Sequence, residues 1–149
     1  MKKNDGITYI EIVVSLILLS LLLALAVNRM GDAQRKKKLK INSQQIYDFF
    51  TKIRSNAKTF GTTHRVVLDG TPLRTLYAMN DTGARIDSLL LYDPNYLNNS
   101  SNDTVLFSSS GGISTIGASQ IILKSTGLSR TYSYAFGSLS GKITMKAVN

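Results

Sequence analysis

The sequence contains no cysteine and only one histidine, His64. Without cysteine, the chain can form neither disulfides nor thiolate metal sites, and it has no cysteine nucleophile. A single histidine excludes a metal site built on a histidine pair. No nucleophile, base and orienting group stand together in a recognisable catalytic signature. The sequence therefore predicts a protein that is not an enzyme and that uses neither a cofactor nor a metal ion.

Acidic residues are scarce. Nine Asp and Glu against 18 Lys and Arg give the 149-residue chain a net charge of +9. This charge permits binding to nucleic acid, anionic lipid or cell-wall polyanions, but it selects none of them. The length leaves room for one modest domain plus an appendage. Much of the Leu, Ile and Val lies between Ile7 and Val27, so the rest of the chain can build only a small core, rich in β-strands.

The run from Ile7 to Val27 has 21 residues, no proline or glycine, and a single charge, Glu11. As a helix it would span roughly 30 Å, the thickness of the hydrocarbon core of a bilayer. We therefore predict a membrane-spanning segment at residues 7–28. Two alternatives are the buried helix of a soluble protein and a secretory signal peptide cleaved near "ALAVN". Because a carboxylate in hydrocarbon is costly, Glu11 is a candidate functional residue.

Residues 29–60 contain no proline, and their apolar residues recur at intervals of three, four and seven. This spacing predicts an amphipathic helix that continues the membrane segment and stops at Gly61. The residues on its apolar face are Leu39, Ile46, Phe49, Phe50, Ile53, Ala57 and Phe60. Such a face needs a partner surface to pack against.

Residues 62–149 are expected to supply that surface as a β-rich head. Seven short segments rich in β-branched and aromatic residues alternate with turn formers such as "NDTG", "SSGG" and "GSLSG". They predict an antiparallel sheet of six or seven strands, whereas "NYLNNSSND" is interpreted as a polar loop. Tyr132, Tyr134 and Phe136 share one strand face and are expected in the core. The predicted fold class is α+β, a long N-terminal helix packed on a small antiparallel β-sheet domain.

The stretch "KKNDGITYIE" holds a short basic leader that ends in Gly6, and Glu11 is the fifth residue counted from Ile7. This block, placed before a membrane-length helix, resembles the class III signal of type IV pilins and type II secretion pseudopilins. The resemblance implies that residues 1–6 are a leader, which a prepilin peptidase removes by cutting between Gly6 and Ile7. It also implies N-methylation of Ile7 and packing of the mature helices as a filament core, with Glu11 setting subunit registration.

Simple electrostatics agrees with these roles. Lys2 and Lys3 would hold the leader on the cytoplasmic side. The new ammonium group on Ile7 could be neutralised by Glu11 of the same or a neighbouring subunit, which offsets the cost of burying both charges. The sequence departs from the family pattern where Ile7 replaces the usual Phe and Tyr9 replaces Leu. Many family members also carry a proline at the position of Asn28, so a kink is not expected here.

A basic run follows the membrane segment and comprises Arg35, Lys36, Lys37, Lys38 and Lys40. It could track the phosphates of DNA, because each neutralised phosphate releases counterions. The alternative is a solvated helix face just outside the membrane that contacts anionic lipid or acidic groups of neighbouring subunits. We favour this alternative, because no aromatic residues interleave the run as a stacking site for bases would require.

The later segments "IRSNAKTFGTTHRVVLDG", "TVLFSSSGG" and "YSYAFGSLSGKITMK" are similar to H-type (GspH/FimT-like) minor pseudopilins. The expected function is that of a minor pilin or pseudopilin subunit of a type IV pilus, competence or type II secretion filament. The expected location is the bacterial cytoplasmic membrane, with a single pass and the C-terminal domain outside, and then the filament. The alternatives are a DNA-binding minor pilin of a DNA-uptake machine and a plain membrane-anchored adhesin or sensor domain.

Overall fold

The computed structural model describes residues 8–69, 74–93, 95–99, 103–117, 120–138 and 141–148, without the side chains of residues 27–29. The predicted processing residues Gly6 and Ile7 lie outside the described residues. The chain divides into two compact units, residues 1–34 and 35–149. One α-helix, α1 (Tyr9–Phe60), belongs to both units and has no break at Asn28.

The described part of the first unit is the N-terminal half of α1. Its side chains are exposed almost throughout and are largely Leu, Ile and Val. The helix contains a segment long and apolar enough to cross a membrane, and none of that segment is buried within the protein. An apolar surface of this extent requires an apolar environment, which a lipid bilayer or other helices can provide.

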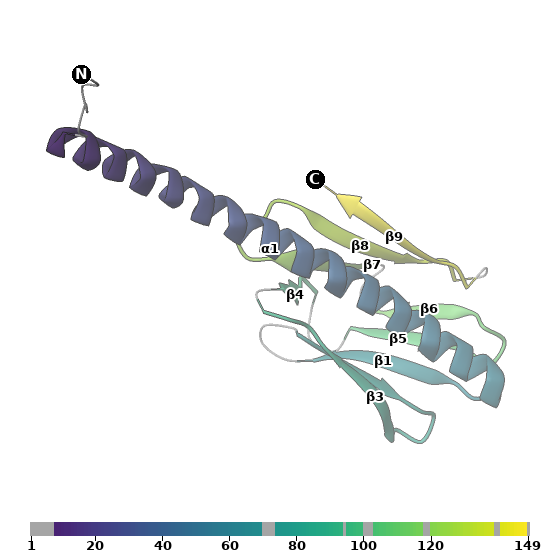
Figure 1. Ribbon diagram of the computed structural model, residues 1–149. Helices are drawn as coiled ribbons and strands as arrows, with labels where there is room; N and C mark the ends of the chain where they lie inside the picture. Colours follow the sequence, from purple (N-terminus) through teal and green to yellow (C-terminus); the bar gives the residue numbers. More distant parts are fainter. Residues whose placement is uncertain are drawn as a thin grey trace. The chain divides into compact units, whose positions relative to one another are not determined.

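The second unit contains the rest of α1 and, within the described residues, nine strands (Figure 1). The strands are β1 (His64–Asp69), β2 (Thr75–Met79), β3 (Arg85–Leu90), β4 (Asn95–Leu97), β5 (Thr104–Phe107), β6 (Ile113–Ile116), β7 (Gln120–Ser125), β8 (Thr131–Phe136) and β9 (Ile143–Val148). The fold is therefore α+β, as the sequence predicts.

The strands form two antiparallel sheets rather than the single predicted sheet. One has the order β3-β2-β1-β5-β6 and the other has the order β4-β7-β8-β9. Two strands were missed by the sequence analysis. The predicted polar loop contains β4, in which Asn95 and Leu97 are buried, and β6 has only four residues and closely follows the turn at Gly111. Strands this short carry too little periodicity to be recognised from the sequence.

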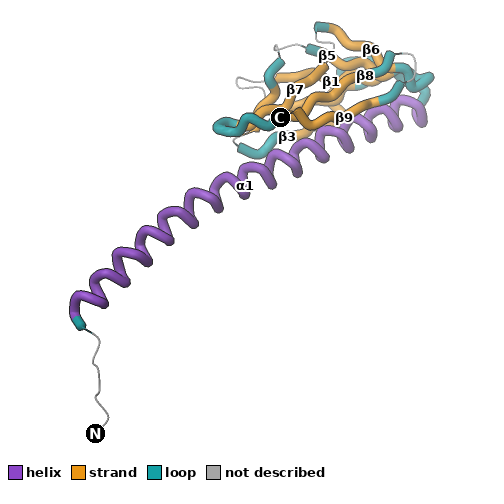
Figure 2. Tube along the Cα trace, turned by 90° about the horizontal axis from the view of Figure 1, so that it is seen from above, coloured by secondary structure: helices purple, strands orange, loops and turns teal. Residues whose placement is uncertain are grey.

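The second half of α1 lies across both sheets, with the strands on one side of the helix (Figure 2). The predicted helix face is confirmed for six of its seven members, which are buried: Leu39, Ile46, Phe49, Phe50, Ile53 and Ala57. Phe60 was predicted to be buried and is instead 69% exposed. Phe60 is the last residue of α1, and the chain turns away at Gly61, whose φ of +67° suits glycine.

Phe50 joins the helix to both sheets. Its ring lies 6.2 Å from that of Phe107 in β5, and 6.3 and 5.2 Å from those of Tyr134 and Phe136 in β8. Tyr132 and Tyr134 are buried and Phe136 packs against the core, which confirms the expectation for these three residues. The aromatic cluster at Phe50 therefore fixes the helix over the line where the two sheets meet.

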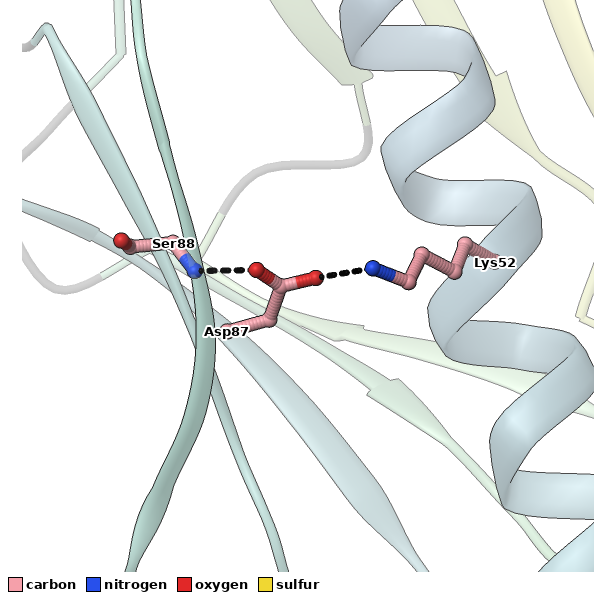
Figure 3. Close-up of polar contacts among 3 residues, drawn as sticks. All are labelled: Lys52, Asp87 and Ser88. Atoms are coloured by element: carbon pink, nitrogen blue, oxygen red, sulfur yellow. Dashed lines mark hydrogen bonds and ion pairs between the residues drawn. The ribbon is translucent and has the colours of Figure 1, made fainter.

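Polar contacts set the position of the helix along the sheets. The Tyr134 hydroxyl donates a hydrogen bond to the backbone oxygen of Ser43 at 2.9 Å. Lys52 Nζ lies 2.8 Å from Asp87 Oδ2, and Asp87 Oδ1 accepts a 2.8 Å hydrogen bond from the backbone N–H of Ser88 (Figure 3). Near the end of the helix, Arg54 Nε donates to the backbone oxygen of Gly111 at 3.1 Å. Together these contacts fix the position of the second half of α1 on the two sheets.

Candidate functional site

The N-terminal end of α1 carries a capping box formed by Thr8 and Glu11. The Glu11 carboxylate oxygen Oε2 accepts hydrogen bonds from the backbone N–H of Thr8 at 2.7 Å and from its hydroxyl at 2.9 Å. In return, the backbone N–H of Glu11 lies 3.1 Å from the backbone oxygen of Thr8 and 3.4 Å from its hydroxyl oxygen. The first-turn position of the carboxylate also suits the positive end of the helix dipole.

The capping box explains locally how a carboxylate can stand at the start of an apolar helix. Two donors from Thr8 compensate part of its desolvation cost, because charge-assisted hydrogen bonds are among the stronger ones. Both recorded bonds end on Oε2, and no recorded hydrogen bond of the described residues ends on Oε1. Glu11 is exposed, so its second oxygen can accept a further donor from outside the helix.

The helix surface beyond Glu11 is apolar on all sides. Large side chains that are at least half exposed include Val14, Leu16, Leu18, Leu22 and Leu25. The polar group of Ser20 is satisfied within the helix, since its hydroxyl donates to the backbone oxygen of Ile17 at 2.8 Å. This surface therefore presents no unpaired hydroxyl at Ser20 to a lipid or helical neighbour.

The basic run lies on α1 at the start of the second unit. Arg35, Lys36, Lys37, Lys38 and Lys40 are all exposed, whereas Leu39 between them is buried. The Arg35 guanidinium lies close to the β7–β8 turn, because a Cβ placed on Gly127 would be 2.9 Å from Arg35 Nη1. The two ion pairs recorded among the described residues, Lys52–Asp87 and Arg74–Asp93, involve none of these five side chains.

No protein-family model matches the sequence, and no curated protein does either. Two solved structures of the minor pseudopilin EpsH from the type 2 secretion system of Vibrio cholerae match with TM-scores of 0.57 and 0.56. They share 15% and 14% sequence identity with this chain, cover 74% and 76% of it, and are themselves covered over 97% and 96% of their length. This chain has a pseudopilin-like fold.

The pseudopilin-like fold agrees with the resemblance drawn from the sequence, both in the long helix and in the head. Thr8 belongs to the sequence block that carries the resemblance, but its role as the capping partner of Glu11 was not predicted. The signal was present, because Thr8 and Glu11 form a Thr-x-x-Glu pattern directly before an apolar run, which is the sequence signature of a capping box. The predicted roles of Gly6, Ile7 and Glu11 in processing and assembly stay predictions.

In the head of this pseudopilin-like fold, the single histidine has a structural position. His64 is buried at the start of β1, with its Nδ1 3.3 Å from the backbone oxygen of Thr62. A depression of about 320 Å³ beside β5 and β6 is lined by hydroxyls and apolar groups, namely Thr63, Leu106, Ser108, Gly112, Ile113, Ser114 and Ser138. Among the described residues, no three carboxylate or imidazole side chains lie close enough together to hold a metal ion.

Proposed function

We propose that this protein is a minor pilin or pseudopilin, a structural subunit that enters the cytoplasmic membrane and is assembled into a filament through α1. The observation that carries the proposal is a pseudopilin-like fold whose N-terminal helix presents an exposed apolar surface with a single carboxylate, Glu11, at its start. Because both similar structures are pseudopilins of a type 2 secretion system, a type II secretion filament is the favoured candidate.

The proposed pathway begins with residues 1–6 as a leader and residues 7–28 as the membrane segment. A prepilin peptidase cuts between Gly6 and Ile7 and methylates the new amino terminus. The lysines of the leader stay in the cytoplasm and the head is translocated. The basic run then also lies on the translocated side, against the usual bias of basic residues, so a dedicated export route must override that bias.

Assembly is proposed to use the free oxygen of Glu11. The capping box holds Oε2 with two donors from Thr8, and no hydrogen bond from the described part of the chain ends on Oε1. An ammonium group on residue 7 of this or a neighbouring subunit could bind Oε1 without displacing the cap. Such a pair neutralises two charges inside an apolar filament core, where leaving either one alone would be strongly unfavourable. The carboxylate would therefore act as the registration point between subunits.

The experiment that tests this proposal is the intact mass and N-terminal sequence of the protein, isolated from membranes of cells with an active prepilin peptidase. The expected result is a chain that starts at Ile7 and is heavier by one methyl group. A chain that starts at Met1, in cells that process other prepilins, would leave a plain membrane anchor. Cleavage near Ala26 would identify a secreted domain and would overturn the filament role.

A further inference from the structure

We propose that Arg35, Lys36, Lys37 and Lys38 form a basic collar around α1, which binds the phosphate groups of anionic lipids at the surface of the membrane that the helix enters. This inference rests on the proposed function, because it requires residues 7–28 to span the bilayer. It assigns a ligand class, the lipid headgroup phosphate, to these four side chains, which have no role in the proposed filament assembly through Glu11.

The arrangement of the four side chains around the helix is the first argument. Consecutive residues of an α-helix point about 100° apart, so four in a row cover the full circumference. All four are exposed in the structure. Lys40 adds a fifth exposed cation one position after the buried Leu39. Arg35 also lies beside Gly127 of the β7–β8 turn. Even so, a ligand that approaches the helix from several sides fits this distribution better than a ligand that approaches from one side.

The distance from the membrane segment is the second argument. Arg35 follows Asn28 by seven residues in the sequence, and seven residues of α-helix have a length of about 10 Å. The headgroup region outside the hydrocarbon core is roughly 5–8 Å thick on each side. Long Lys and Arg side chains can bridge the remaining gap, because their flexible stems let the charged ends reach toward the interface.

The direction of the side chains adds to this reach. Every Cα–Cβ bond of an α-helix tilts toward the N-terminus of the helix. The membrane segment lies on the N-terminal side of the collar in the sequence, so the four stems start out leaning toward it. Side chains that follow a membrane segment on the same helix thus lean back toward the headgroups, whereas side chains that precede one lean away.

The local charge leaves the collar available for an anion. From Arg29 to Lys40 the chain has six basic residues and one acidic residue, Asp32. Asp32 stands one turn before the collar and can compensate at most one of its charges, and the next acidic residue is Asp48. Attraction between the collar and an anionic surface is screened over about 8 Å at physiological salt, so it acts only at close range to the headgroups.

Duplex DNA is the competing ligand for the same cations, and the geometry favours it less. A duplex lies against one side of a helix and would leave the opposite collar residues unused. No tyrosine or phenylalanine stands between Arg35 and Lys40, so a stacking platform for single-stranded bases is also missing from the run. A bilayer surface, in contrast, surrounds the helix that passes through it.

The test uses the full-length protein reconstituted into phosphatidylcholine vesicles with or without phosphatidylglycerol. A limiting amount of an amine-reactive acylating reagent is added, and mass spectrometry measures the extent of acylation at each lysine. We expect phosphatidylglycerol to slow acylation of Lys36, Lys37 and Lys38 several-fold and high salt to remove the effect. Lys58 at the end of α1, and Lys124 and Lys146 in the head, serve as internal controls and should react equally in both membranes.

A pair of variants separates the collar from general charge. The first carries Lys36→Gln, Lys37→Gln and Lys38→Gln, and the second carries Lys58→Gln, Lys124→Gln and Lys146→Gln. Both lose three positive charges. When each is purified from mixed membranes with its bound lipid, the first should carry a lower ratio of phosphatidylglycerol to phosphatidylcholine than the wild type, and the second should match the wild type.

The remaining outcomes overturn the inference in distinguishable ways. If alkaline carbonate extracts the protein from the vesicles, membrane insertion fails and the proposed function fails with it. If the protein stays inserted but phosphatidylglycerol slows acylation of all six lysines by one common factor, or of none of them, only the collar is refuted. If duplex DNA protects Lys36, Lys37 and Lys38 in detergent at a salt concentration where phosphatidylglycerol vesicles do not, the run is a DNA-binding site.

Discussion

The hydroxyl of Tyr134 donates a hydrogen bond to the backbone oxygen of Ser43 at 2.9 Å, which links the middle of β8 to the second half of α1. The tyrosine side chain is fully buried. Replacing Tyr134 with Phe removes the donor, whereas the carbonyl keeps its helical partner. We expect Tyr134→Phe to lower the free energy of unfolding by about 1 kcal/mol, measured by near-ultraviolet circular dichroism of the detergent-solubilised protein in denaturant.

A control variant and a pH titration accompany this substitution. Tyr92 is 57% exposed, and Tyr92→Phe should leave the stability unchanged.

Burial, with a smaller contribution from neighbouring Tyr132, raises the pKa of Tyr134 well above the usual value for tyrosine. The wild type should therefore lose stability as the pH rises above about 10, where tyrosines of the unfolded chain ionise. If the wild type and Tyr134→Phe lose equal amounts of unfolding free energy at alkaline pH, the loss does not come from the buried hydroxyl of Tyr134.

Phe50 contacts aromatic rings of both sheets, and its truncation should separate the helix from the head. Phe50→Ala removes a fully buried ring from the contacts with Phe107, Tyr134 and Phe136. We expect a loss of about 4 kcal/mol in the free energy of unfolding, measured by denaturant titration. Phe60 is a matched control on the same helix. Because it is 69% exposed, Phe60→Ala should cost less than about 0.5 kcal/mol.

Much of this fold could be predicted from local patterns in the sequence. The spacing of three, four and seven residues identifies the buried face of α1, because a helix repeats every 3.6 residues and apolar groups must leave water. The same reasoning fails at Phe60, since periodicity cannot tell where the underlying surface ends. The stop at Gly61 was predicted correctly, and its positive φ gives the physical reason.

The division into two sheets could not be predicted, because strand pairing depends on contacts between residues far apart in the sequence. In β4, Asn95 is a typical turn residue that is nevertheless buried opposite Ser125 of β7. At the candidate site, Glu11 was recognised from the cost of its charge, whereas the capping role of Thr8 was not predicted, although the Thr-x-x-Glu pattern is visible in the sequence. The roles of Gly6 and Ile7 rest on the sequence motif alone.

The ion pair between Lys52 and Asp87 predicts an acid-dependent loss of stability. The hydrogen bond from Lys52 lowers the pKa of Asp87. Burial opposes this shift, and the N–H of Ser88 and the charge of Lys52 add smaller lowering effects. A lowered pKa contributes stability above the pKa of the unfolded chain, about 4, and this contribution is lost as the pH falls through the folded pKa. Because both side chains are partly exposed, we expect only about 0.5 kcal/mol.

The measurement is the free energy of unfolding of the wild type and of Asp87→Asn between pH 7 and pH 2. The variant should be less stable at neutral pH, and the difference should vanish at the acidic end. Asp48→Asn makes the same charge change on an exposed helix position that bonds only Gln44 among the described residues. If Asp48→Asn gives the same pH profile, the effect comes from net charge and not from the ion pair.

The charge and the capping role of Glu11 can be separated by two substitutions. Glu11→Gln keeps an amide oxygen that can accept both hydrogen bonds from Thr8, but it removes the negative charge. Glu11→Ala removes the cap and the charge together. If the carboxylate neutralises an ammonium group between subunits, both variants should enter the membrane and both should fail to assemble. The measurement is the amount of each variant in sheared or pelleted filaments of the native host, relative to its amount in the membrane.

Thr8→Val supplies the reverse control. It removes the hydroxyl donor and keeps the charge at Glu11, so it should assemble nearly normally. Normal assembly of Glu11→Gln together with poor assembly of Thr8→Val would show that the capping box, and not the charge, is what the filament requires.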